Sequence, residues 1–120
     1  KLGLKDSVIF TGVRSDVNRL LQAMDVFVFP SLYEGLGIVA VEAQAAGLPC
    51  VISDKVPDEC IVTEGLVTVQ KLSDSAENWA KHIVSRANMQ RKDTGEQIKA
   101  HGFDIAENVK WLEEFYLKHG

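Results

Sequence analysis

Two glutamates, eight positions apart, flank a glycine turn and are the residues of this chain best suited to ligand chemistry. Glu34 comes directly before Gly35-Leu36-Gly37, and Glu42 follows in a helix-forming run at residues 38–46. A helix entered through glycines leaves its first N–H groups unpaired at the positive end of its dipole, which suits a phosphate or another anion. Carboxylates beside that anion site accept hydrogen bonds from hydroxyl groups. The pattern therefore favours a ligand with phosphate in one part and hydroxyls in the rest.

Each of these features also has a purely structural alternative. The glycines could serve only a tight turn, because short glycine motifs are common. Glu42 lies in a run that is apolar on nearly every side, which predicts a buried helix, and a buried carboxylate is costly unless it is hydrogen-bonded. Either a protein donor satisfies Glu42, or the carboxylate faces a cleft and binds ligand hydroxyls. In the second case the ligand chemistry is that of a nucleotide sugar.

The surrounding elements place the turn at one edge of a parallel sheet. An aromatic and β-branched run at residues 25–29 predicts a strand that ends at Pro30. The helix after the turn ends at Gly47, and Pro49 forbids its continuation. Further strands are predicted at residues 8–10, 50–53 and 66–69, and helical periodicity predicts further helices at residues 16–24, 76–87, 94–101 and 104–116. Alternating strands and helices predict an α/β fold, a Rossmann-like parallel sheet flanked by helices, with ligands at the carboxyl ends of the strands.

Composition narrows the class of protein further. The 120 residues are enough for one domain, and a net charge of −4 argues against a nucleic-acid surface. No apolar run approaches the length that spans a membrane. Cys50 and Cys60 lack the short spacing of a metal site, and Cys50 in its apolar strand is predicted to be a small buried hydrophobe. Together these features predict a reduced, cytoplasmic protein.

The central motif resembles the signature of retaining glycosyltransferases with the GT-B fold, of the family 4 (group 1) type. It reads Pro30-Ser31-x-x-Glu34-Gly35-x-Gly37-x-x-x-x-Glu42-Ala43-x-Ala45-x-Gly47-x-Pro49. The resemblance extends to Val8-x-Phe10-x-Gly12 and Asp16-Val17. The segment Asp54-x-Val56-Pro57-x-Glu59 resembles members that make bacterial capsular and exopolysaccharides. The resemblance as a whole implies that residues 1–120 are a donor-binding domain. This would be a partial C-terminal domain, truncated at its N-terminal side, and the acceptor domain would be absent.

The resemblance implies roles for the two glutamates. The counterpart of Glu42 holds the ribose hydroxyls of the nucleotide in this family. The counterpart of Glu34 contacts hydroxyls of the transferred sugar near the reacting centre, which makes Glu34 the predicted catalytic residue. Whether Glu34 acts as a nucleophile stays open. Glu59 has two readings, a helix-start residue by default and a cleft residue by family position.

The other implied donor contacts run through the backbone. In the turn Gly35-Leu36-Gly37, amides of Leu36 and Gly37 would meet the sugar and the diphosphate, together with the amide of Ile38. The backbone of Val13 and Arg14, in the loop after Gly12, would lie against the nucleobase. The family's diphosphate-binding Arg and Lys have no counterpart here. We therefore expect the isolated 120 residues to be inactive without the missing N-terminal domain of the same chain.

The implied activity is transfer of a sugar from a nucleoside-diphosphate sugar, UDP-linked on family grounds, with retention. The acceptor would be a saccharide or a lipid-linked saccharide, and neither a metal nor a cofactor is implied. The full-length protein would be cytoplasmic, with peripheral attachment to the inner face of the membrane compatible with such acceptors. Two alternatives stay open: a non-catalytic Rossmann-like binding module, and a relative of the nucleotide-sugar epimerases.

Overall fold

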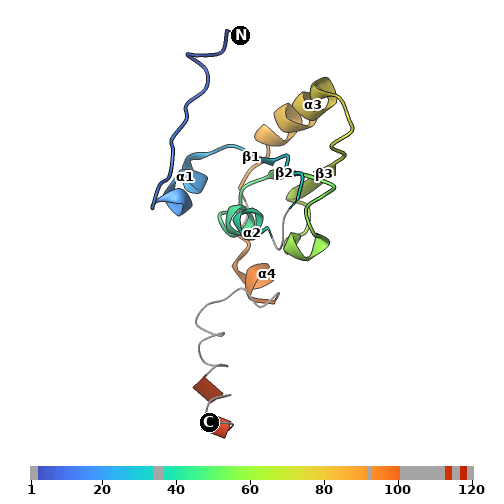
Figure 1. Ribbon diagram of the computed structural model, residues 1–120. Helices are drawn as coiled ribbons and strands as arrows, with labels where there is room; N and C mark the ends of the chain where they lie inside the picture. Colours follow the sequence, from blue (N-terminus) through green and yellow to red (C-terminus); the bar gives the residue numbers. More distant parts are fainter. Residues whose placement is uncertain (1–2, 34–36, 92, 101–112, 115–116, 119–120) are drawn as a thin grey trace.

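A parallel three-stranded sheet lies at the centre of the computed structural model, which describes residues 3–33, 37–91, 93–100, 113–114 and 117–118 (Figure 1). The strands are ordered β1-β2-β3, and each is parallel to the next. The elements in chain order are α1 (Val17–Ala23), β1 (Phe27–Phe29), α2 (Ile38–Ala45), β2 (Cys50–Ser53), the 3-10 helix η1 (Asp58–Cys60), β3 (Val67–Gln70), α3 (Ala76–Ala87) and α4 (Gly95–Ala100). The predicted Rossmann-like α/β fold is confirmed.

Most predicted boundaries agree with the structure to within two residues. The strand at residues 50–53 and the helix at residues 76–87 have the predicted bounds, and Gly47 has the left-handed φ of 73° that ends α2. The strand at residues 25–29 is shorter than predicted, because β1 pairs with β2 only over Phe27–Phe29. The helix predicted at residues 104–116 lies almost wholly outside the described residues.

The hydrophobic core lies on the face of the sheet that α2 covers. Alternate strand residues point to this face, since Phe27 pairs with Cys50 and Phe29 with Ile52 in the parallel register. The rings of Phe27 and Phe29 have centroids 5.6 Å apart. Helices α1, α2 and α4 complete this layer with Leu21, Ala40, Val41, Ala43 and Ile98. The predicted burial of Cys50 is confirmed.

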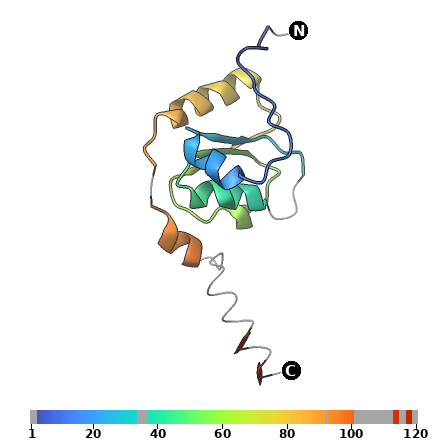
Figure 2. The ribbon, with the colours of Figure 1, turned by 90° about the vertical axis from the view of Figure 1, so that its left-hand side faces the viewer.

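Helix α3 covers the opposite face of the sheet. Figure 2 shows α3 above the sheet, with α1 and α2 below it. The helix begins after Ser75, whose side chain accepts a hydrogen bond from the Asn78 amide at 3.2 Å, so Ser75 caps the helix. Trp79 is buried, and its indole N–H donates to the Lys71 carbonyl at 3.0 Å. Trp79 is therefore a core residue, as its position on the apolar stripe predicts.

Arg91 joins the carboxyl ends of two helices. Its guanidinium donates to the carbonyl of Ala46, after α2, at 2.8 Å. It also donates to the carbonyls of Leu21, Gln22 and Met24, at the end of α1, at 2.8, 2.7 and 2.5 Å. A cation at a helix C-terminus satisfies carbonyls that have no partner within the helix. This arginine therefore fixes α1 beside α2.

The strand predicted at residues 8–10 does not form. Residues 3–15 are all exposed, and the side chains of Ile9 and Phe10 are 86% and 94% exposed. A strand is stable only when a neighbour satisfies its hydrogen bonds. This segment runs apart from β1 (Figure 1), so the described part of the chain offers it no such neighbour. The family resemblance implied this strand, and a pairing partner decides whether it forms.

Candidate functional site

The start of α2 lies at the carboxyl end of β1, where the sequence places the anion site. Gly37 is the N-cap residue, with φ 73° and ψ 44°, and no side chain caps the helix there. The Ala40 amide donates to the Gly37 carbonyl at 2.9 Å, which closes the first turn. Amides before Ala40 have no acceptor within the helix and lie at its positive end. The predicted entry into the helix through glycine is confirmed at Gly37; Glu34, Gly35 and Leu36 lie outside the described residues.

Gly37 is also closely packed, so that a side chain there would require its neighbours to shift. A Cβ atom built on Gly37 would lie 3.2 Å from Cγ1 of Val56 and 3.4 Å from Cβ of Cys60. The residue is buried, and the segment containing η1 forms the surface beneath it. Gly37 therefore serves a tight turn. It leaves the amides of the first helical turn available to a ligand.

Glu42 is exposed, which corrects the prediction of a helix buried on every side. It shares an outward stripe with Ile38, which is 49% exposed, and with Ala45. Within the described part of the chain, no group donates a hydrogen bond to the Glu42 carboxylate. The protein-donor alternative for Glu42 is therefore not realised there. Because α2 has small and apolar residues on nearly every side, its sequence does not indicate which side packs on the sheet.

The buried polar residue of α2 is Gln44, which sequence analysis missed. Its side chain is completely buried and bridges α2 to the segment after η1. Its Nε2 donates to the carbonyls of Ala40 and Cys60 at 3.0 and 2.6 Å. Its Oε1 accepts from the amides of Val62 and Thr63 at 2.9 and 3.1 Å, and from the Thr63 hydroxyl at 2.8 Å. The available signal was an amide side chain on the same stripe as Ala40 and Ala43.

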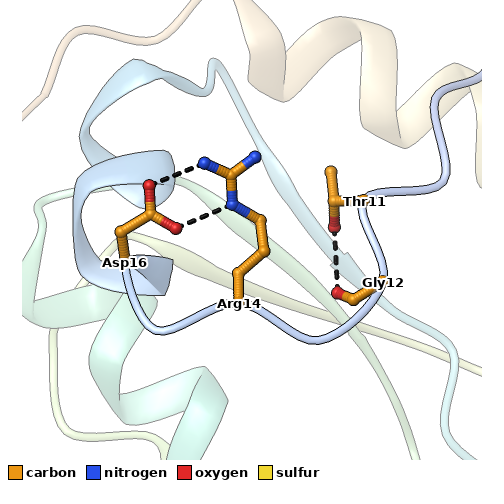
Figure 3. Close-up of polar contacts among 4 residues, drawn as sticks. All are labelled: Thr11, Gly12, Arg14 and Asp16. Atoms are coloured by element: carbon orange, nitrogen blue, oxygen red, sulfur yellow. Dashed lines mark hydrogen bonds and ion pairs between the residues drawn. The ribbon is translucent and has the colours of Figure 1, made fainter.

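The predicted nucleobase loop, at Val13 and Arg14, is exposed. Val13 is fully exposed, whereas Gly37 is buried against Val56 and Cys60. Arg14 and Asp16 form a two-pronged ion pair, with Nε to Oδ1 and Nη2 to Oδ2 both at 2.7 Å (Figure 3).

The ion pair between Arg14 and Asp16 shifts the pKa of both side chains. The Arg14 guanidinium lowers the pKa of the Asp16 carboxyl, and Asp16 raises the pKa of Arg14. Asp16 occupies the N-cap position of α1, yet its side chain makes no cap hydrogen bond because it is bound to Arg14. The ion pair engages the side chain of Arg14 and not the backbone of the loop. The resemblance implies a contact to the nucleobase through the backbone of Val13 and Arg14.

The two cysteines near the site are not nucleophiles. Both are buried free thiols. Burial, with a smaller contribution from Cys60, raises the pKa of Cys50 to about 12, and burial also raises the pKa of Cys60. Thiols that stay protonated are unreactive. Glu59 is exposed in the first turn of η1, which agrees with the helix-start reading.

Neither a metal site nor the groove beside α3 involves the predicted site residues that the structure describes. Among the described residues, no group of three or more His, Cys, Asp or Glu side chains could hold a metal ion. A groove of about 430 Å³ lies between β1 and α3, on the side of the sheet away from α2, and is lined by Val28, Pro30, Leu72, Asp74, Trp79 and Ile83 among others. The groove contains none of the predicted site residues.

Comparison with known proteins shows the family to which this chain belongs. Residues 1–113 match the family described as glycosyl transferases group 1. The chain belongs to the group 1 glycosyltransferases. The matched residues include the glutamate and glycine motif that leads into α2.

Individual relatives in this family agree. EpsF of Bacillus subtilis, which is named as a glycosyltransferase, is 40% identical over 116 residues, covering 94% of this chain and 30% of EpsF. UDP-Gal:alpha-D-GlcNAc-diphosphoundecaprenol alpha-1,3-galactosyltransferase of Escherichia coli is 31% identical over 121 residues, covering 97% of this chain and 31% of the relative. The lipopolysaccharide core biosynthesis mannosyltransferase LpsB of Rhizobium meliloti is 37% identical over 65 residues, covering 54% of this chain and 18% of LpsB.

The chain spans about a third or less of the length of these relatives. Among the helices that the structure describes, none has both the length and the apolar character needed to cross a membrane.

Proposed function

We propose that this chain is the donor-binding part of a retaining glycosyltransferase that takes its sugar from a UDP-sugar. The observation that carries the proposal is the start of α2. There Gly37 opens a helix without a side-chain cap, at the carboxyl end of β1, and the same helix presents an exposed Glu42 carboxylate. Amides at a helix start bind phosphate, and a free carboxylate accepts hydrogen bonds from hydroxyls. One short element thus supplies both halves of nucleotide-sugar recognition.

Each predicted residue has a place in this proposal. Glu42 holds the ribose hydroxyls, and Glu34 contacts the transferred sugar near the reacting centre as the candidate catalytic residue. The amides of Leu36, Gly37 and Ile38, in the turn that Gly35 opens, bind the sugar and the diphosphate.

The base is held separately from these contacts. In the proposal, the backbone of Val13 and Arg14 lies against the nucleobase once the loop is brought to the site in the full-length protein. The fully exposed Val13 leaves the backbone of this loop accessible.

Catalysis would consist largely of positioning and of stabilising the diphosphate leaving group. Amides that point at the developing negative charge lower the barrier, because they are already oriented when the bond breaks. The proposal invokes no metal and no cofactor. Retention follows from the family type and is part of the proposal.

The acceptor is proposed to be a saccharide carried on a lipid diphosphate. Support comes from the Escherichia coli relative, whose name gives UDP-Gal as donor and a diphosphoundecaprenol-linked sugar as acceptor. The lipopolysaccharide name of LpsB also fits a surface polysaccharide. An enzyme with such an acceptor would work at the inner face of the membrane, together with the N-terminal acceptor-binding domain of its own chain.

Calorimetric titration of the full-length protein with UDP and UDP-sugars tests the proposal. Glu42→Ala should weaken UDP binding about tenfold to a hundredfold, because hydrogen bonds to a charged group are worth about 1.5–3 kcal/mol. Glu77→Ala is the matched control, since Glu77 is an exposed helical glutamate in the first turn of α3, on the other side of the sheet. Its binding should equal that of the wild type.

The alternatives predict different results. A non-catalytic Rossmann-like module would bind no nucleotide sugar, or would bind one equally well after Glu42→Ala. An epimerase relative would bind UDP-sugars but would convert them without an acceptor. Either result would contradict the proposed function.

A further inference from the structure

We propose that Gln44 is a positioning residue of the donor site, acting through the segment that supports the Gly37 turn. This inference rests on the proposed function, because it assigns Gln44 to the same site. Gln44 is completely buried, whereas Glu42, two positions earlier on α2, is exposed. The helix thus presents one polar side chain to a ligand and buries another within the protein.

The Gln44 amide makes a two-sided connection. Its Nε2 donates to the Cys60 carbonyl at 2.6 Å, at the end of η1. Its Oε1 accepts from the Val62 and Thr63 amides at 2.9 and 3.1 Å. Donor and acceptor are both used, so the segment at residues 60–63 can lie against α2 in one register only.

The same segment supports the turn at Gly37. Cys60, which Gln44 binds through its carbonyl, is one of the two residues that a Cβ on Gly37 would touch, and Val56 is the other. Gly37 holds its left-handed φ of 73° against this surface. A shift of residues 56–63 would therefore alter the start of α2, where the proposed diphosphate contacts lie.

A third element fixes the other end of the connection. The Thr94 hydroxyl, just before α4, donates to the backbone carbonyl of Gln44 at 2.6 Å. Thr94 is itself buried. The backbone carbonyl of Gln44 is thus bonded to Thr94, and the side chain of Gln44 is bonded to the segment at residues 60–63.

Neither leucine nor ionised glutamate reproduces both halves of this connection. Leucine has similar bulk but would leave the Cys60 carbonyl and the Val62 and Thr63 amides without their partner, and buried unpaired groups drive local rearrangement. Glutamate keeps the acceptor, and it gains a donor only in its protonated form. Burial favours that neutral form.

The test uses steady-state kinetics of the full-length protein with a UDP-sugar donor, well below the melting temperature. Gln44→Leu should raise KM for the donor, or lower kcat/KM, about tenfold to a hundredfold, as small misplacements of binding groups do. Trp79→Phe is the matched control, because it removes one buried hydrogen bond, to the Lys71 carbonyl, on the other face of the sheet. It should lower the melting temperature and leave KM unchanged.

Gln44→Glu supplies a second readout, and it carries the test if Gln44→Leu does not fold. Its kcat/KM relative to the wild type should rise as pH falls from about 8 to about 6, because protonation restores a donor toward the Cys60 carbonyl. A ratio that stays flat and low with pH would contradict the proposal.

The failures of the two proposals are distinguishable. If the wild type binds UDP-sugar, Glu42→Ala weakens that binding as proposed and Gln44→Leu leaves KM unchanged, then Gln44 has no positioning role and the proposed function stands. If Gln44→Leu and Trp79→Phe raise KM equally, Gln44 is only structural. If the wild type binds no nucleotide sugar, both proposals are overturned.

Discussion

Gly37 shows how one residue meets two requirements at once. Its φ of 73° is a left-handed conformation, and its missing side chain lets Val56 and Cys60 approach. Gly12 meets only the first requirement, because its φ is 67° but a Cβ there would have nothing within 4 Å. Comparing Gly37 with Gly12 therefore distinguishes the effect of backbone strain from the effect of close packing.

Gly37→Ala should therefore destabilise the chain more than Gly12→Ala. Left-handed backbone costs an L-residue about 1–2 kcal/mol at either position, and overpacking adds about 1–3 kcal/mol at Gly37 alone. Urea denaturation of the two variants measures the difference in free energy of unfolding. Equal losses would show that Val56 and Cys60 yield without cost.

Glu42 and Gln44 show how little separates a ligand group from a structural one. The two residues are two positions apart, so their side chains point about 200° apart around α2. One is exposed, and the other is completely buried with every polar atom bonded. Their burial follows from which side of α2 packs on the sheet.

At the scale of elements, the loop before α3 is held by one carboxylate. Asp74 accepts hydrogen bonds from the Asn78 side chain and the Ser75 amide at 2.7 and 2.8 Å, and from the Gln70 side chain at the end of β3. These donors, with Asn78 the largest cause, lower the pKa of the Asp74 carboxyl. The bonds tie β3 to the first turn of α3.

Acid should weaken this connection. Because the folded-state pKa of Asp74 is lowered, its contribution to stability is present above its unfolded pKa of about 4 and is lost as pH falls further. Asp74→Asn should remove this part of the pH dependence. Urea denaturation of both proteins between about pH 3 and pH 6 checks it, and parallel curves would contradict the assignment.

At the scale of the whole molecule, two helical layers enclose the sheet, and residues 3–15 lie outside these layers. Helix α3 covers one face, and α1, α2 and α4 cover the other. Ile9 and Phe10 remain exposed outside these layers, where they add nothing to the core. The stability of the described body thus comes from residues after α1 begins.

Replacing each of two phenylalanines with alanine tests this division. Phe10→Ala should change the free energy of unfolding of the 120-residue chain by less than about 0.5 kcal/mol, as exposed substitutions do. Phe29→Ala, which removes a ring packed on the core, should cost about 2 kcal/mol or more. Equal costs in thermal denaturation would show that Phe10 is packed after all.

The sequence was sufficient to predict the ends of helices and strands where a residue's own backbone preference sets them. Pro30 cannot donate to a strand ladder, Gly47 accepts a left-handed conformation, and Ser75 caps its own helix. These residues act on neighbours a few positions away, so the order β1, glycine turn, α2, β2 and the start of α3 could be predicted from the sequence. The family motif at the turn could be read in the same way.

Only the tertiary structure decided the features that depend on a distant partner. Residues 8–10 have apolar side chains that suit a strand, but the described residues offer them no strand to pair with. Arg91 is bonded to the ends of two helices. Gln44 is buried because residues 60–63, far along the chain, supply its donors and acceptors. Burial and pairing are properties of what the fold brings together, and a local pattern contains no information about that partner.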